Sequence, residues 1–212
     1  MKTPEVVSFS SEELVLVDSN DRECGFASKA DAHMGEGRLH RAFSVFLFDR
    51  HGRLLLHQRS AHKPLWPGYW TNSCCSHPRR GEQLDAAVRR RLREELGCAA
   101  SMLQRVGSFE YHARYRDLGS EHELCHIYLA RVDSPGEVHA HALEIADLRW
   151  VGVSEVDALM GEERTDLSPW FREEWALLRE TYAAELDAFV AEALAPGAPA
   201  DPDPSRPPEL TA

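Results

Sequence analysis

The sequence predicts an α+β fold, with a mixed β-sheet flanked by helices, extra strands at the N-terminus and extra helices at the C-terminus. Residues 40–49 are aromatic and apolar on both faces, as is typical of a central strand. Leu84, Val88, Leu92 and Leu96 recur every four residues and predict an amphipathic helix. Along the chain, strands precede this helix and further strands and then helices follow it, which favours a mixed sheet covered by helices.

The N-terminal part of the chain consists mostly of predicted strands. Residues 12–17 predict a first strand and residues 23–27 a weaker second one, separated by a turn at residues 18–21. Residues 28–38 are rich in Asp, Gly and Ala and predict a loop. The central strand is followed by a turn at residues 50–52 and an antiparallel strand at residues 53–59. Residues 60–69 predict a second loop, and residues 70–78 predict a stiff turn.

The C-terminal part of the chain mixes strands and helices. Gly97 is a suitable C-cap for the charged helix that begins near residue 83. Residues 106–111 and 121–132 predict strands joined by a polar loop over residues 114–120, and residues 148–153 predict another short strand. The Ser-x-x-Asp pattern at residues 154–157 predicts a capped helix over residues 154–160. Ser168 and Pro169 then predict the start of one long helix that ends near residue 194.

The chain is expected to form a single domain over residues 1–195. Its 212 residues are enough for one domain with a substantial core. Residues 196–212 consist largely of Pro, Ala and Asp. This segment cannot bury enough apolar surface to fold, so it predicts a disordered tail.

The amino-acid composition argues against some classes of binding partner. A net charge of −11 argues against a nucleic-acid-binding protein, although a local cluster of Lys and Arg could still hold a phosphate. No apolar run approaches the roughly 20 residues needed to cross a bilayer. The five cysteines are odd in number and two of them are adjacent, which favours reduced thiols in the cytosol. We therefore expect a cytoplasmic protein with neither a nucleic acid nor a membrane as partner, and the choice between monomer and homodimer stays open.

The helix after residue 83 resembles part of the Nudix signature, in which carboxylates on one helix face hold Mg²⁺ on a diphosphate. The signature positions present are Glu82, Arg90, Glu94, Glu95 and Gly97. Ser76 stands where the signature has its first Gly, and Arg91 where it has a Glu. An Arg cannot ligate a divalent cation, but it offers a planar fork to phosphate oxygens. The helix therefore favours diphosphate binding over diphosphate cleavage; a solvated face of mixed charge is the alternative.

Three histidines and two glutamates could share one metal ion: His33, His40, His77, Glu121 and Glu123. The two glutamates are two residues apart on a predicted strand, so they face the same side. This donor set suits a six-coordinate Mn²⁺ or Mg²⁺, and Zn²⁺ is also compatible with it. Each His alone is more often a surface or core residue than a ligand. The thiols lack the Cys-x₂-Cys spacing of a structural zinc site.

Cys75 is the candidate reactive thiol. Thiolate chemistry needs a pKa below the free value of about 8.5, which His77 and a bound metal ion would provide. A buried structural cysteine is the alternative. Cys74 points the opposite way if the segment is extended, so we expect it to be structural.

Together these residues resemble the type I isopentenyl-diphosphate isomerases, Nudix-superfamily members that rearrange a double bond and do not hydrolyse. The resemblance runs from about Val15 to Trp175. Its most specific pieces are residues 38–44, 66–78, 90–97 and 168–170, together with Glu121 and Glu123. The resemblance implies a Nudix-like sheet and the interconversion of isopentenyl diphosphate and dimethylallyl diphosphate, a step of isoprenoid precursor biosynthesis.

The resemblance also implies a role for each site residue. Cys75 and Glu123 would form the catalytic pair, with Tyr111 assisting Glu123. The Mn²⁺ or other divalent ion would be bound by His33, His40, His77, Glu121 and Glu123. A second ion, Mg²⁺ carried with the diphosphate, would be placed by Glu95 and the backbone carbonyl of Cys75. The small diphosphate substrate would be held by Lys29, Arg59, Lys63 and Arg91, with Trp170 over its hydrocarbon end.

The implied reaction makes demands on the pocket. Moving the double bond requires a proton onto C4 and another off C2, through a tertiary cation that water would trap. The pocket must therefore be dry and lined with π faces, which Trp70, Tyr111 and Trp170 could supply. We expect Glu123, with Tyr111, to deliver one proton and Cys75, as thiolate, to remove the other, with exchanged roles for the reverse reaction. Trp66 and Trp175 are expected to pack in the core.

Two other functions stay open on the residues alone. The first is a Nudix diphosphatase, against which Arg91 argues. The second is a metal- or phosphate-binding module without catalysis, in which Lys29, Lys63 and Cys75 would be dispensable together. Conversion of isopentenyl diphosphate, release of phosphate, or neither would separate the three.

Overall fold

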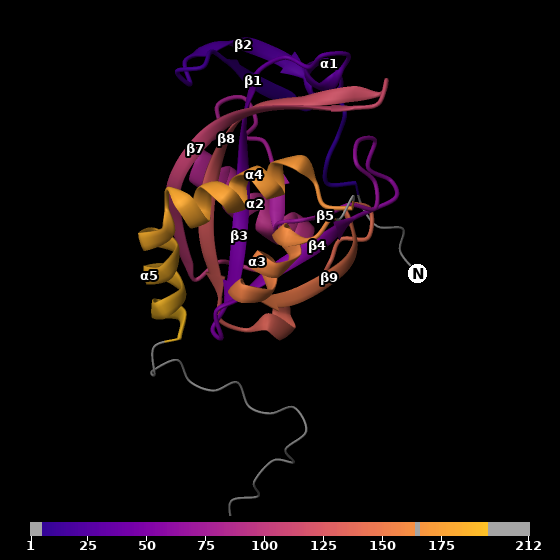
Figure 1. Cartoon of the computed structure of the whole chain (residues 1–212). Coiled ribbons are helices and arrows are strands. Elements are labelled where there is room, and N and C mark those ends of the chain that lie inside the picture. Colours follow the sequence, from indigo (N-terminus) through magenta and orange to yellow (C-terminus); the bar gives the residue numbers. More distant parts are fainter. Residues whose placement is uncertain (1–5, 164–165, 195–212) are drawn as a thin grey trace, which may run out of the picture.

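The computed structural model describes residues 6–163 and 166–194. Within these residues the strands form one nine-stranded mixed sheet with helices on both faces (Figure 1). The central strand is β3 (His40–Asp49), and β8 (Gly119–Val132) runs parallel to it over its whole length. The predicted class, a mixed sheet flanked by helices with N-terminal strands and C-terminal helices, is confirmed.

On the edge of β3 opposite β8, three antiparallel strands pair with β3 one after another. They are β1 (Glu13–Val17) at its start, β6 (Cys74–Ser76) in its middle and β4 (Arg53–Arg59) at its end. Four strands continue the sheet outward: β2 (Glu23–Ser28) beside β1, β5 (Trp70–Thr71) and β9 (Ile145–Gly152) beside β4, and β7 (Met102–Tyr115) beside β8. The start of β3 is thus surrounded by β1, β6 and β8.

Alternation along β3 divides the core into two layers. Phe43, Val45 and Leu47 pack with the apolar stripe of α2 (Leu84–Leu96) on one face of the sheet. Phe46 and Phe48 pack on the other face with α3 (Val153–Gly161), α4 (Pro169–Glu180) and α5 (Ala183–Ala193). Successive side chains of a strand point to opposite faces, so an apolar strand such as β3 needs cover on both sides.

The predicted helix with its Gly97 cap is confirmed. Gly97 adopts the left-handed conformation, with φ 63°, that is common for glycine at the C-terminal end of a right-handed α-helix. Its N–H donates to the carbonyl of Arg93. The strands predicted around residues 12–17, 23–27, 40–49, 53–59 and 148–153 are also present, with shifted ends for some. The hairpin of β7 and β8 is longer than expected, because pairing continues to Tyr115 and Gly119 and leaves only residues 116–118 as the turn.

Two predictions about helix starts are wrong. Residues 28–38 contain the short helix α1 (Lys29–His33) instead of a loop only, because the Ser28 hydroxyl caps it by accepting the N–H of Asp31 at 3.1 Å. The predicted cap at Ser154 is absent: α3 begins at Val153, after an N-cap at Gly152 that has no side chain to bond with.

The predicted single C-terminal helix is two helices, α4 and α5. The chain leaves helical geometry at Tyr182, with φ −112° and ψ 27°. The Tyr182 ring lies against Gly107 of β7, so closely that a Cβ on Gly107 would be 2.1 Å from its hydroxyl. The break lets α5 place Phe189 beside Phe48 of the sheet, with ring centroids 6.0 Å apart. Tertiary packing, which no local pattern encodes, sets this boundary.

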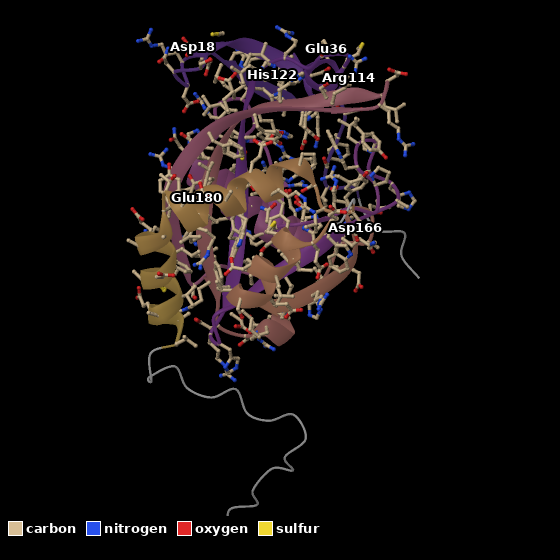
Figure 2. All side chains as sticks on the ribbon, viewed as in Figure 1. Asp18, Glu36, Arg114, His122, Asp166 and Glu180 are labelled. Atoms are coloured by element: carbon tan, nitrogen blue, oxygen red, sulfur yellow. The ribbon has the colours of Figure 1, made fainter. Side chains whose placement is uncertain are left out.

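The stiff turn predicted at residues 70–78 contains the two short strands β5 and β6. Surface side chains such as Asp18, Glu36, Arg114 and His122 gather around the end of the molecule formed by β1, β2 and the hairpin (Figure 2). Across residues 6–163 and 166–194, no helix combines the length and apolar character required to span a membrane. The predicted domain boundary at residue 195 and the predicted disordered tail over residues 196–212 lie outside the described residues.

Candidate active site

Sheet register brings the candidate residues onto one face. His40 pairs with Glu123 across β3 and β8, and Glu123 pairs with Tyr111 across β8 and β7. Farther along β3, Ser44 pairs with Cys75 of β6. Because these pairs lie at even spacing along β3, their side chains share the face that α4 covers.

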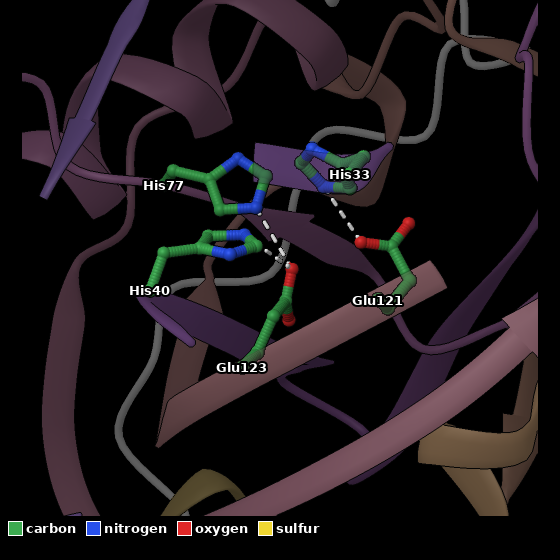
Figure 3. Close-up of side chains that lie close together, drawn as sticks. All are labelled: His33, His40, His77, Glu121 and Glu123. Carbon is green, nitrogen blue, oxygen red and sulfur yellow. Dashed lines mark hydrogen bonds and ion pairs between the residues drawn. The ribbon is translucent and has the colours of Figure 1, made fainter. Parts of the chain in front are cut away.

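The five candidate metal ligands converge at the start of β3 (Figure 3). His33 comes from the last residue of α1, and His77 directly follows β6. Glu121 and Glu123 project from the same side of β8, as predicted, whereas His122 between them contacts Glu110 at 3.4 Å. One donor atom from each of the five residues lies within 4.8 Å of all the others. The structure therefore brings the whole predicted set together.

Short contacts connect the imidazoles and carboxylates of this cluster. His33 Nε2 lies 2.7 Å from Glu121 Oε2, and His77 Nε2 lies 2.8 Å from Glu123 Oε1. His40 Nε2 is 3.5 Å from the same oxygen of Glu123. The other oxygen of that carboxylate accepts a 2.7 Å hydrogen bond from the hydroxyl of Tyr111.

The histidine tautomers fit a bound cation. Nδ1 of His33 and Nδ1 of His40 each lie 2.7 Å from a backbone carbonyl, of Lys29 and Arg38 respectively. A carbonyl only accepts, so both Nδ1 atoms carry hydrogen, and each Nε2 atom is directed at the carboxylates. An Nε2 atom in this position can donate to the carboxylate as an imidazolium, or it can offer its lone pair to a cation bound between the two groups. Among the described residues, His40 Nε2 is buried with no hydrogen-bond partner, and it lies 3.5 Å from Glu123 Oε1, as a free ligand atom would.

Ionisation in the cluster also suits metal ligation. Burial opposes the charge on Glu121 and Glu123, yet His33 and His40 keep the pKa of these carboxyls below its ordinary value. Burial, reinforced by the charge of His40, lowers the pKa of His77 well below its usual range. Carboxylates and a neutral imidazole are the forms that bind a divalent ion.

A cavity of about 510 Å³ opens beside the cluster. Its walls combine cluster members with three cations, a thiol and three aromatic side chains. Besides His77 and Glu123, the lining residues that matter here are Lys29, Arg59, Lys63, Cys75, Tyr111 and Trp170. Of the aromatic residues expected to line a dry pocket, Tyr111 and Trp170 do so, whereas Trp70 packs against the main core instead.

The cationic wall of the cavity suits an anion. Burial, together with the charges of Lys63 and Arg91, lowers the pKa of Lys29 to about 8. Glu144 lines the same cavity. Its Oε2 forms an ion pair with Lys63 Nζ at 2.7 Å and lies 3.9 Å from Arg91 Nη2. Burial opposes the ionisation of Glu144, but Lys63 brings its pKa to about 2. Outside the metal cluster, the charged lining residues are the cations Lys29, Arg59 and Lys63 and the one carboxylate Glu144, so positive charge is in excess there. No motif around Glu144 pointed to it from the sequence.

Arg91 and Glu95 lie behind this wall and contact each other. Arg91 is 2% exposed, and its guanidinium reaches Glu95 Oε1 at 2.5 Å. The same guanidinium donates to the carbonyl of Val7 at 2.6 Å. Their expected roles, holding diphosphate and a second Mg²⁺, stay predictions.

Arg59 is held in place by the loop that precedes β5. Its Nε donates to the carbonyl of Trp66 at 3.1 Å and its Nη2 to that of Leu65 at 2.8 Å. Its guanidinium carbon also lies 5.2 Å from the ring centre of Trp170. Trp66 and Trp175 are buried in the core, as predicted.

Cys75 faces the cavity side of the sheet, while Cys74 is buried on the α2 side, as predicted. The Sγ atom of Cys75 lies 3.4 Å from Ser44 Oγ and 3.0 Å from Asn72 Oδ1. Burial raises the pKa of Cys75 to about 12. The expectation that His77 and a bound metal ion together lower this pKa stays a prediction, to which His77 alone adds little because burial lowers its own pKa. The protein's own groups therefore favour the thiol.

Ser76, which replaces the usual Gly, causes no backbone strain. Among the non-glycine residues that the structure describes, positive φ occurs only at Asp21, Trp66 and Arg116. Ser76 lies in β6 and pairs with Phe43. A side chain is therefore tolerated at this position.

Comparison with known proteins agrees with this geometry. Residues 38–171 match the family model described as NUDIX domain. The protein DR0079 of Deinococcus radiodurans, whose structure is solved, superposes with a TM-score of 0.62 at 22% identity. That alignment covers 81% of this chain and 99% of the other, and at this identity it supports the fold alone. The fold and the domain match place the chain in the Nudix superfamily.

Sequence relatives with higher identity than DR0079 indicate which Nudix family the chain belongs to. An isopentenyl-diphosphate Delta-isomerase of Serratia proteamaculans is 49% identical over 84% of this chain and 96% of its own length. Isopentenyl-diphosphate Delta-isomerase 1 of Photorhabdus laumondii is 38% identical over 82% of this chain and 99% of its own length. The chain belongs to the isopentenyl-diphosphate Delta-isomerase family.

Proposed function

We propose that this chain is an isomerase that interconverts isopentenyl diphosphate and dimethylallyl diphosphate, a reaction that supplies isoprenoid precursors. The observation that carries the proposal is one cavity lined by the cations Lys29, Arg59 and Lys63, by the Cys75 thiol and by the paired Tyr111 and Glu123. Family membership supports it. Cations would hold the diphosphate, and two proton-carrying groups would serve the hydrocarbon.

The histidine–carboxylate cluster fits a divalent cation, which His33, His40, His77, Glu121 and Glu123 would hold. Mn²⁺ and Mg²⁺ suit this donor set, and Zn²⁺ is compatible with it. Such an ion would supply a fixed positive charge beside the carboxylate of Glu123. A second Mg²⁺, bound with the diphosphate, is proposed at Glu95 and the Cys75 carbonyl.

Cys75 and Glu123 carry one proton between them in the state that the protein's own field favours. Burial keeps Cys75 as a thiol, and His40 keeps Glu123 ionised despite its burial. This state exchanges the roles expected from the sequence: Cys75 donates its proton to C4, the π electrons form the new C–H bond, and Glu123 accepts the proton from C2. The opposite proton distribution, Glu123 as acid with Tyr111 and Cys75 as base, serves the reverse direction. Tyr111 holds the Glu123 carboxyl through its 2.7 Å hydrogen bond.

The tertiary cation between these two steps needs protection from water. Trp170 is 2% exposed and Tyr111 6% exposed, although both line the cavity. Their ring centroids are 6.2 Å apart, so they form one aromatic wall. The π faces of such a wall stabilise a cation and exclude water.

We further propose that the enzyme acts in the cytoplasm on a small diphosphate, without a nucleic acid or a membrane as partner. All five cysteines lie in the described residues and are free thiols, which supports a reducing compartment. Whether the chain works as a monomer or a homodimer is a separate question for solution measurements.

The test supplies isopentenyl diphosphate with Mg²⁺ and follows dimethylallyl diphosphate. Cys75→Ala should abolish conversion while the content of bound divalent metal is unchanged, because its thiol is not among the five ligand side chains. Cys24→Ala, at an exposed cysteine, is the matched control and should keep full activity. Normal turnover by Cys75→Ala would overturn the assignment. Phosphate release would indicate a diphosphatase, and neither product a binding module.

A further inference from the structure

A buried chain of hydrogen bonds connects the aromatic wall of the cavity to the Cys75 thiol. Trp170 Nε1 donates to Thr71 Oγ1 at 3.0 Å, and Ser168 Oγ donates to the same oxygen at 2.8 Å. Thr71 Oγ1 then donates to Asn72 Oδ1 at 2.9 Å, and Cys75 Sγ donates to that oxygen at 3.0 Å. Thr71, Asn72 and Ser168 have no solvent-exposed surface.

The direction of each bond follows from the donors available. The indole N–H of Trp170 can only donate, so the Thr71 hydroxyl oxygen accepts this hydrogen bond. The Thr71 hydroxyl hydrogen is therefore free to be donated to Asn72 Oδ1. Asn72 Nδ2 donates to the carbonyl of Val45 at 3.2 Å, which orients the amide with Oδ1 toward Thr71 and Cys75. Asn72 Oδ1 therefore accepts from both sides. The Cys75 thiol is turned toward it, and Ser44 Oγ lies on another side at 3.4 Å.

The chain spans two elements that are remote in sequence. Thr71 belongs to β5, and Trp170 is in the first turn of α4. An isolated bridge between Trp70 and Leu167 and the hydrogen bond from Ser168 N to the Trp70 carbonyl, 2.9 Å long, hold the same two segments together. The start of α4 and the strand before Cys75 thus form one bonded unit.

We propose that Thr71 and Asn72 are positioning residues, which hold the Sγ atom of Cys75 at the reacting carbon and tie that position to Trp170. The inference rests on the proposed isomerase function. Neither residue lines the cavity, and both act through Cys75 and Trp170. Without the chain, the short side chain of Cys75 is free to choose another rotamer. A misplacement of about 1 Å at a reacting group can cost about 100-fold in rate.

The effect should fall on kcat and spare KM. The diphosphate-binding cations Lys29, Arg59 and Lys63 make no hydrogen bond with Thr71 or Asn72 in the part of the chain that the structure describes. A substitution of Thr71 or Asn72 therefore leaves the diphosphate-binding groups in place, so the affinity for the substrate should not change. Only the geometry of the proton carrier changes.

The experiment compares Thr71→Val with Thr71→Ser in the metal-loaded full-length chain. Val keeps the shape of Thr but has no hydroxyl, whereas Ser keeps the hydroxyl. We expect Thr71→Val to lower kcat by about 10- to 100-fold with KM within about threefold, and Thr71→Ser to retain most of the turnover. Thr181→Val, an exposed site between α4 and α5, controls for the substitution type and should leave kcat unchanged.

A second measurement does not depend on turnover. The rate of Cys75 alkylation by iodoacetamide, resolved from the other cysteines by peptide mass spectrometry, should change several-fold in Thr71→Val and stay near wild type in Thr71→Ser. Equal kcat and equal alkylation in the two variants would overturn the inference, as would a rise in KM with unchanged kcat. An inactive wild type would refute the proposed function instead, and the alkylation comparison would still decide the inference. Thr71→Ala, which also removes the hydroxyl, replaces Thr71→Val if that variant does not fold.

Discussion

Glu174 is a buried carboxyl whose neutralisation should change the pH dependence of stability. The side chain lies in α4 with no exposed surface, and its Oε1 accepts a 3.4 Å hydrogen bond from Cys125 Sγ. Its Oε2 has no hydrogen-bond partner among the described residues. Burial raises the pKa of Glu174 from 4.5 to about 8. The substitution Glu174→Gln replaces this titrating group with a neutral one of the same shape.

The sign follows from the raised pKa. The folded protein holds the Glu174 proton more tightly than the unfolded chain, so folding free energy is lost as pH rises from about 4.5 to about 8. Between pH 5 and pH 8 the loss amounts to about 3 kcal/mol, at 1.36 kcal/mol per pKa unit. In Glu174→Gln this loss disappears. The new Nε2 lacks a partner as Oε2 did, so both proteins bear a similar desolvation cost at every pH and the slope is unaffected.

The assay is urea unfolding of wild type and Glu174→Gln between pH 5 and pH 8, with EDTA present so that only the protein's own charges act. The difference in unfolding free energy between the two proteins should move by about 3 kcal/mol in favour of the variant toward pH 8. Glu180→Gln, at an exposed residue of the same helix, should show no comparable trend. Parallel curves for wild type and Glu174→Gln would show that Glu174 is already ionised in the folded protein, and would refute the reasoning.

Two further predictions concern packing and metal binding. Gly107→Ala should destabilise the fold by about 1–3 kcal/mol in urea unfolding, because its Cβ would meet the Tyr182 ring; Gly136→Ala, where a Cβ meets nothing within 4 Å, should not. A Gly107→Ala loss equal to that of Gly136→Ala would contradict this contact. His40→Gln should lower the content of bound divalent metal measured by mass spectrometry, whereas exposed His51→Gln should leave it unchanged. Full metal occupancy in His40→Gln would remove His40 from the ligand set.

The alternation of side chains along a β-strand was enough to predict which way some of the site residues point. Glu121 and Glu123 had to share a face because they are two apart on a strand, and Cys74 had to point away from Cys75 for the same reason. That His40 stands beside Glu123 depends on the parallel register of β3 and β8. Register between strands about 80 residues apart is set by the whole sheet, so only the resemblance to a family supplied this pairing in advance.

Residues without a motif could not be found from the sequence. Glu144 enters the cavity through the turn before β9 and matters only because Lys63 is 2.7 Å away. Thr71 and Asn72 were visible as part of a specific stretch, but their role depends on Trp170, almost one hundred residues later. The break between α4 and α5 likewise comes from Tyr182 packing on Gly107, which local propensity for a continuous helix does not anticipate.

The arginines of α2 show why this Nudix helix suits a non-hydrolytic site. Arg90 pairs with Glu82 at 2.7 Å and with Glu94 at 2.9 Å, and Arg91 pairs with Glu95 at 2.5 Å. The three signature carboxylates are thus neutralised by neighbouring guanidinium groups, and any Mg²⁺ at Glu95 would have to share its carboxylate with Arg91. The cluster of His33, His40, His77, Glu121 and Glu123 instead lies on the other face of the sheet, with no Arg or Lys among its members. The described residues therefore concentrate their metal-binding donor groups beside Glu123 and Tyr111, the groups proposed here to handle the substrate's protons, and not on the helix where a hydrolase would activate water.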